Sequence, residues 1–225
     1  MSTVPVIAID GPGGVGKGTT ARALAHRLGW HFLDSGALYR ILALAMSRAG
    51  VPADQPGKVA ALAPELDIQF ALEGVDERIL VDGRDVTNEV RAETTGSLAS
   101  QIAPFPEVRA ALLRRQQAFR KAPGLVADGR DMGTVVFPDA VLKVFLDATP
   151  EERARRRQIQ LSRAGINAKL SNLCAEIRDR DVRDRNRRHS PLRAADDAVV
   201  LDTTDLRPEA VLSRIEQWVR ERGLR

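Results

Sequence analysis

The sequence is poor in cysteine and in aromatic residues, and it contains no long hydrophobic run. Cys174 is the single cysteine, which excludes an internal disulfide and fits a reducing cytosol. Aromatic residues make up 4% of the 225 residues, too few to line a nucleic-acid groove with stacking rings. No stretch approaches the roughly 18 apolar residues of a membrane span, and no signal peptide opens the chain. We therefore expect a cytoplasmic protein that binds neither membrane nor nucleic acid.

The positive charge of the chain is carried mostly by arginine. Only 5 of the 34 basic residues are lysines, and the formal net charge is +4. The planar guanidinium suits bidentate contacts with phosphate better than the ammonium group of lysine does. Most exposed arginines are expected in surface ion pairs, but this balance also predicts an acidic ligand. The hydrophobic content of 44% is enough for a sizeable core, which must be built largely from aliphatic side chains.

Four short aliphatic runs each lead directly into an aspartate. They are Val4–Ile9 before Asp10, Gly124–Ala127 before Asp128, Val141–Leu146 before Asp147, and Val199–Leu201 before Asp202. Residues Thr19–Leu28 have the apolar spacing of a helix, with Gly29 as its C-cap. Strand, glycine loop and helix in this order predict an α/β fold with a parallel sheet, whose carboxyl edge binds the ligand.

Two further segments predict different structure. Asp67–Leu72 alternates and Arg78–Val81 runs into Asp82-Gly83, so residues 61–95 predict a small antiparallel β insert. Residues 150–189 are densely charged and predict two helices, beginning at Pro150 and separated near Gly165. The remaining ranges, about 1–60, 96–149 and 190–225, would form the core of a single domain.

A phosphate-binding loop is predicted directly after the first strand. Its residues follow the pattern G-x-x-x-x-G-K and are Gly11, Pro12, Gly13, Gly14, Val15, Gly16, Lys17, Gly18 and Thr19. Backbone N–H groups and the helix N-terminus would cradle phosphate, and Lys17 would reach the terminal phosphates of ATP. Gly18 stands where a serine or threonine would ligate Mg²⁺, so the metal would be contacted through water by Asp10 or Asp128.

Three segments could bind the acceptor, although each also has a purely structural interpretation. Ser35 lies at a predicted helix start and Arg40 follows it, while Arg130 and Asp131 lie between two glycines after a predicted strand. In a helix predicted at Leu173–Arg188, three residues spaced i, i+4 and i+7 share one face. They are Arg180, Asp184 and Arg187.

Taken together, DGPGGVGKGT, LDSGALYR, ADGRDMGTVVFPDA and EIRDRDVRDRNRR resemble bacterial cytidylate kinases, in the same order and over nearly the whole chain. The resemblance implies a P-loop three-layer fold in which residues 61–95 are an enlarged acceptor-binding insert and residues 150–189 form an arginine-rich lid over ATP. It also implies an activity that transfers the γ-phosphoryl group of ATP to CMP or dCMP. It further implies that Ser100, Arg109 and Asp131 read cytosine, that Arg180 and Asp184 hold the ribose, and that Arg40, Arg130 and Arg187 surround the acceptor phosphate.

The expected mechanism needs no nucleophilic side chain. Phosphoryl transfer depends on in-line positioning and on neutralising negative charge, for which Lys17, Arg130, Arg187 and Mg²⁺ are the candidates. A lid arginine would also contact ATP, but spacing does not select among Arg153, Arg155, Arg156 and Arg157.

Other activities are weighed against this one. A kinase acting on UMP or AMP differs only in its base reader, and Asp131 favours a base that carries an amino group. A nucleic-acid-binding ATPase would explain the basic charge but lacks aromatic residues. A GTPase would need the N-K-x-D motif, which the sequence does not contain. No long amphipathic surface demands a partner, so we expect a monomer that binds small nucleotides.

Overall fold

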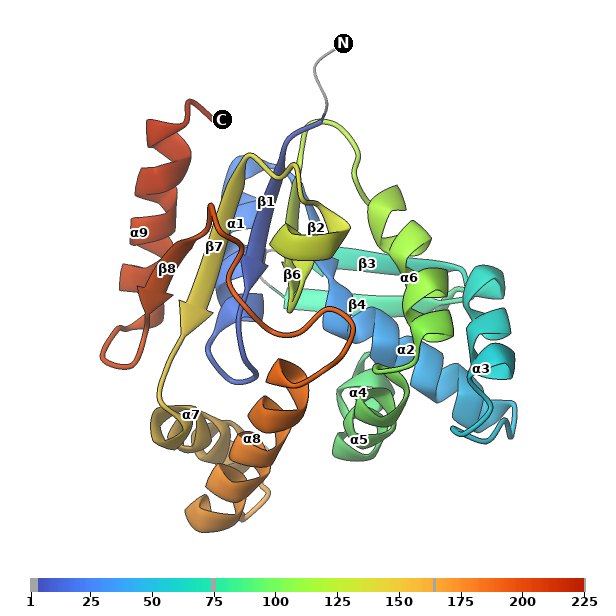
Figure 1. Cartoon of the computed structure of the whole chain (residues 1–225). Coiled ribbons are helices and arrows are strands. Elements are labelled where there is room, and N and C mark those ends of the chain that lie inside the picture. The colour runs from blue at the N-terminus through green and yellow to red at the C-terminus, as the bar shows by residue number, and fades with distance from the viewer. Residues whose placement is uncertain (1–3, 74–75, 164, 225) are drawn as a thin grey trace.

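The computed structural model describes residues 4–73, 76–163 and 165–224. Within them, a five-stranded parallel sheet in the order β2-β6-β1-β7-β8 forms the centre of the molecule (Figure 1). Its strands are β1 Val6–Asp10, β2 His31–Asp34, β6 Leu125–Gly129, β7 Leu142–Asp147 and β8 Val199–Asp202. This sheet confirms the predicted α/β fold.

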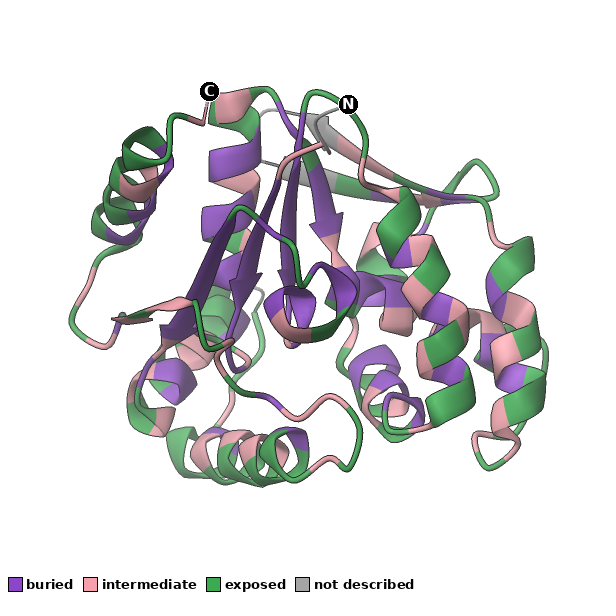
Figure 2. Ribbon diagram, turned by 45° about the horizontal axis from the view of Figure 1, so that its top comes forward, coloured by how far each residue is buried: buried purple, intermediate pink, exposed green. Residues whose placement is uncertain are grey.

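Helices cover both faces of the sheet, which explains why its central strands are continuous aliphatic runs. Side chains alternate along β1: Val6 and Ala8 pack among the helices on one face, Ile7 and Ile9 on the other. Figure 2 shows the central strands as buried along their length. The helices that pack on them are α1 Lys17–Leu28 and α9 Pro208–Glu221 on the Ile7 face, and α2 Ser35–Arg48 and α6 Pro106–Ala118 on the Val6 face.

The predicted element boundaries need small corrections. Helix α1 begins at Lys17, two residues earlier than predicted, because Gly16 takes a left-handed conformation with φ 97° and starts it. Gly29 is the C-cap, as predicted, with φ 62°. The segment His31–Asp34 was not predicted as a strand, yet it pairs in parallel with β6 at the sheet edge.

The second sheet is antiparallel and small, as predicted. Its strands are β3 Ile68–Glu73, β4 Asp76–Val81 and β5 Arg84–Asp85, and the β4–β5 turn is made by Asp82 and Gly83 with φ 51° and 76°. Short helices surround it in the chain: α3 Pro56–Leu62, the 3₁₀ turn η1 Ala63–Glu65, α4 Thr87–Arg91 and α5 Glu93–Ile102. The division of the chain into core, insert and lid stays a prediction.

The charged segment forms two packed helices, α7 Pro150–Arg163 and α8 Leu170–Arg185. They lie beyond the carboxyl ends of β1 and β7 (Figure 1). The predicted helix Leu173–Arg188 was placed too late: α8 ends at Arg185, so Arg187 follows the helix and does not lie on it. Among the described residues, no helix combines the length and apolar content needed to cross a bilayer.

Candidate active site

The phosphate loop lies between β1 and α1, at the carboxyl edge of the sheet. Gly14 and Gly16 have φ of 80° and 97°, conformations that glycine adopts without strain. At Gly11 an added Cβ would collide with the carbonyl oxygen of Leu146, so the loop begins in close contact with β7. The chain therefore forms a glycine-dependent loop of the kind that binds phosphate.

Lys17 is buried at the centre of this loop. Its Nζ donates to the carbonyl oxygen of Pro12 at 2.8 Å and lies 3.9 Å from Asp128 Oδ1. Burial, with the nearby guanidinium of Arg130, lowers the pKa of Lys17 to about 7. Burial raises the pKa of Asp128 to about 6, an effect that the charge of Lys17 opposes. Both groups would regain favourable interactions if polyphosphate and a cation entered the loop.

A single pocket brings together all nine residues predicted to bind the acceptor. It lies beside the end of β6, between α2, α5 and α8. The predicted residues that line it are Ser35, Arg40, Ser100, Arg109, Arg130, Asp131, Arg180, Asp184 and Arg187. They come from four segments far apart in the sequence, so the fold has gathered them at one place.

Asp184 organises the arginines of this pocket. Its carboxylate is 2% exposed, forms an ion pair with Arg187, and accepts a 3.4 Å hydrogen bond from Arg130 Nε. The Nε of Arg180 lies 3.9 Å away and, although 39% of that side chain is exposed, this atom is buried without a hydrogen-bond acceptor. Burial and the charge of Arg130 lower the pKa of Arg180 to about 10. One carboxylate thus holds three arginines, which leaves the pocket strongly positive.

Other pocket residues are held by neighbouring backbone. Arg40 Nη1 donates to the carbonyl oxygens of Val90 and Ala92, both at 3.0 Å, and burial lowers its pKa. Ser35 Oγ donates to Gln116 at 2.7 Å, while Ser100 Oγ donates to the carbonyl oxygen one turn earlier in α5. The helix N-cap is Asp34, not Ser35, so the hydroxyl of Ser35 is not used for capping.

Asp131 lies at the start of a π-helical turn, η2 Met132–Val136, that follows β6. Its side chain is 7% exposed and forms an ion pair with Arg109, so a carboxylate faces the pocket next to a guanidinium. Because an ionised carboxylate only accepts hydrogen bonds, this group can recognise an amino group on a ligand.

The phosphate loop and the pocket are adjacent. A Cβ built on Gly13 would lie 3.5 Å from Arg130 Nη2 and 3.8 Å from Arg180 Nη1. These two guanidiniums therefore stand where the loop meets the pocket. A chemical group transferred between the loop and the pocket would pass beside the positive charges of Arg130 and Arg180.

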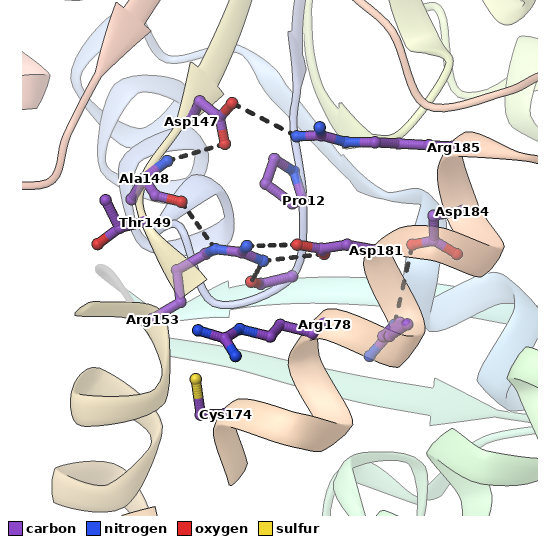
Figure 3. Close-up of polar contacts among 12 residues, drawn as sticks. Pro12, Asp147, Ala148, Thr149, Arg153, Cys174, Arg178, Asp181, Asp184 and Arg185 are labelled. Atoms are coloured by element: carbon purple, nitrogen blue, oxygen red, sulfur yellow. Dashed lines mark hydrogen bonds and ion pairs between the residues drawn. The ribbon is translucent and has the colours of Figure 1, made fainter. Parts of the chain in front are cut away.

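Arg153 connects the loop to α8. Its guanidinium is 1% exposed, donates to the carbonyl oxygens of Ala148 at 3.0 Å and Gly13 at 3.2 Å, and forms a bidentate pair with Asp181. Figure 3 shows it reaching from α7 towards Asp181, next to the Pro12 segment. Arg153 is one of the four arginines predicted as candidates to contact ATP. In the structure its Nε, Nη1 and Nη2 atoms each donate to a protein acceptor.

Replacing Asp181 with alanine should destabilise the protein by about 3–5 kcal/mol, because it leaves the buried charge of Arg153 unpaired. Urea unfolding measures the change. The matched control is Glu151→Ala, whose partner Arg178 is 61% exposed, and it should lower the unfolding midpoint only slightly. The double variant Arg153→Met with Asp181→Leu should recover most of the loss. If Asp181→Ala lowers the free energy of unfolding no more than the control does, the pair does not have this stabilising role.

The other lid arginines differ in their partners. Arg156 donates to Thr203 and to the carbonyl oxygen of Val15, while Arg155 pairs with Glu152 and is 66% exposed. Arg157 pairs with Glu93 of α5. Burial, with the nearby charge of Arg40, lowers its pKa. Of the four, Arg157 is therefore the one that lies near the charge of Arg40.

Several residues of the site were not found from the sequence. Tyr39 lines the pocket, and Arg109 lies 5.9 Å from its ring centre. Gly96 lines the pocket as well, and an added Cβ there would lie 2.6 Å from Arg40 Nη2. No local pattern marks these two positions. Asp181 could have been suspected from its place next to Arg180, but its partner Arg153 is 28 residues earlier.

Known proteins resemble this chain in sequence over nearly its whole length. A family model described as Cytidylate kinase matches residues 7–221. The cytidylate kinase of Stutzerimonas stutzeri (strain A1501) is 56% identical over 226 residues, which cover 100% of this chain and 99% of the relative. That of Photobacterium profundum is 53% identical and covers 98% and 97%. The solved shikimate kinase of Acinetobacter baumannii is 19% identical, with a TM-score of 0.46 and coverage of 99% and 97%. The chain therefore belongs to the cytidylate kinase family.

Proposed function

We propose that this chain transfers the γ-phosphoryl group of ATP to CMP or dCMP, giving ADP and CDP or dCDP. The observation that carries the proposal is the contact between a glycine-rich phosphate loop and a pocket that holds both an arginine cluster and a buried carboxylate. Membership of the family supports it. The expected setting is the cytoplasm, and the expected form is a monomer.

In this proposal the chain's own groups position phosphate and stabilise charge. The backbone N–H groups of the phosphate loop, which Pro12 lacks, and Lys17 bind the phosphates of ATP, while Arg40, Arg130 and Arg187 bind the acceptor phosphate. The acceptor oxygen is already anionic, so the reaction needs no general base. Arg130 and Arg180, next to Gly13, stabilise the negative charge that spreads over the transferring group.

Mg²⁺ is proposed as the cofactor, and Asp128 suits it. Among the described residues no group of three or more acidic, histidine or cysteine side chains could hold a metal alone. Mg²⁺ bound to a nucleotide typically uses one or two carboxylates together with phosphate oxygens and water. Asp128 Oδ2 lies 3.1 Å from a Cβ built on Gly18, so it faces the position where a serine or threonine hydroxyl would otherwise stand. When bound, the ion would neutralise phosphate charge.

Asp131 is proposed to select the base. Its carboxylate would accept a hydrogen bond from the exocyclic amino group of cytosine, whereas uracil presents a carbonyl oxygen at the same place. Ser100 and Arg109 line the same end of the pocket and would contact the ring, while Arg180 and Asp184 would hold the ribose hydroxyls.

The test is ADP release from ATP and Mg²⁺, measured with CMP, dCMP, UMP, AMP, GMP or no acceptor. Turnover confined largely to CMP and dCMP is the expected result. Turnover with UMP or AMP instead would retain a kinase but overturn the base specificity. ATP hydrolysis that needs no acceptor would overturn the kinase itself.

A further inference from the structure

Asp10 lies where the phosphate loop meets η2, the turn that follows Asp131. It is the last residue of β1 and directly precedes Gly11. In the sheet it is paired in register with Gly129, two residues before Asp131. Its side chain is not required by the proposed chemistry, since Asp128 already provides a carboxylate at the loop.

Both oxygens of Asp10 are used by the backbone that follows Asp131. Oδ1 accepts from the N–H of Met132 and Oδ2 from the N–H of Gly133, each at 2.8 Å, and Asp10 is only 5% exposed. These N–H groups are the first two of η2, which have no acceptor within their own turn. Asp10, at the end of β1, therefore caps this turn.

The turn needs such support because its backbone is unusual. Asp131 has φ −146° and ψ 24°, and its carbonyl oxygen accepts from Val135 and Val136 in a π-helical turn. Such turns are rare and often occur at functional sites. Lys143 also packs closely against Gly133, where an added Cβ would lie 3.1 Å from its Cδ and 3.4 Å from Asp10 Oδ2. The conformation of this segment sets where the Asp131 carboxylate lies in the pocket.

We infer that Asp10 is a positioning residue for base selection, acting through Met132 and Gly133 on Asp131. The inference rests on the proposed CMP kinase activity and assigns Asp10 a role other than contact with Mg²⁺. Bound to two backbone N–H groups, its carboxylate fixes the start of the turn and hence the distance from Asp131 to the base.

Asp10→Asn is the direct test, because the amide keeps the shape but turns one N–H acceptor into a donor. The ratio of kcat/KM for CMP to that for UMP should fall about fivefold to tenfold, since a shift of Asp131 by a fraction of an ångström should cost less than the roughly 10²-fold that a 1 Å misplacement can cause. The KM for ATP and the Mg²⁺ concentration for half-maximal rate should change less than about twofold. Asp139→Asn, at a 53% exposed carboxylate, is the control and should leave the ratio unchanged.

A double variant separates positioning from a merely structural role. In Asp10→Asn/Asp131→Asn the ratio should equal that of Asp131→Asn alone, because Asp10 acts only through Asp131. If Asp10→Asn does not fold, Asp10→Ser, which keeps one acceptor oxygen, replaces it in both measurements.

Three outcomes would overturn the inference. In the first, Asp10→Asn keeps the wild-type ratio of kcat/KM for CMP to UMP but needs more Mg²⁺. In the second, Asp10→Asn loses kcat/KM equally with CMP and with UMP. In the third, the effects of the two substitutions on the ratio multiply in the double variant. The wild-type ratio is measured first. A wild type that does not prefer CMP would overturn the proposed function, whereas a CMP-selective wild type with an unchanged Asp10→Asn ratio would overturn this inference alone.

Discussion

Replacing Lys17 with methionine should lower kcat/KM for ATP about 10²- to 10³-fold, the usual effect of removing one group that stabilises transition-state charge. Methionine fills the buried space left by the lysine stem but brings no charge to the phosphates. Steady-state kinetics at saturating CMP measures the effect. Lys58→Met, at an exposed lysine of α3, is the matched control and should retain full activity. A Lys17→Met enzyme within tenfold of the wild type would contradict the assignment.

Lys17 should also make ATP binding take up a proton at alkaline pH. In the free protein its pKa is lowered to about 7, so at pH 8 the amine is mostly neutral. Contact with polyphosphate favours the charged form and raises the pKa, so binding at pH 8 takes up as much as one proton. At pH 6 the amine is already charged before and after binding, and it takes up none. Calorimetry in buffers of different ionisation enthalpy measures the uptake, which should disappear in Lys17→Met.

Asp131→Asn should reduce the preference for CMP over UMP by about 10- to 100-fold, the discrimination typical of one well-placed polar contact to a base. The carboxylate can only accept hydrogen bonds, whereas the amide can donate to the carbonyl oxygen of uracil. The rate with CMP should therefore fall while the rate with UMP rises. Competition between the two nucleotides in one assay measures the ratio.

Two comparisons make the Asp131 result specific. The KM for ATP should not change, because Asp131 lies in the pocket and not in the loop. Asp139→Asn has the same chemical change at an exposed site and should leave the ratio as it is in the wild type. If Asp131→Asn loses activity equally with CMP and UMP, Asp131 does not select the base.

The core of the fold was predictable because its signals are local. The aliphatic runs, the loop glycines and the C-cap at Gly29 each reflect the needs of a few adjacent residues, and the structure confirms them. The strand at His31–Asp34 was missed because it has four residues, begins with an exposed histidine and lies at the sheet edge. The end of α8 was misplaced because Asn186 and the arginines around it give no strong stop signal.

The contacts inside the site were not predictable in the same way. The resemblance led to the nine pocket residues, but nothing in the run Arg153–Arg157 indicates that Arg153 is fully buried against a partner on another helix. The two N–H groups bound by Asp10 lie more than 120 residues away in the chain. Such pairs depend on strand register and helix docking, which only the three-dimensional arrangement specifies.

Helix α8 contacts both the surroundings of the phosphate loop and the pocket. Asp181 pairs with Arg153 next to the loop, and Arg185, one turn later, pairs with Asp147 at the end of β7. Arg180 and Asp184 of the same helix line the pocket. Because a helix moves nearly as a rigid rod, a shift that tightens one set of contacts must also move the other. The two binding equilibria are therefore linked through a shared mechanical element, and the affinity for CMP should depend on whether the loop is filled, by the same factor in either direction.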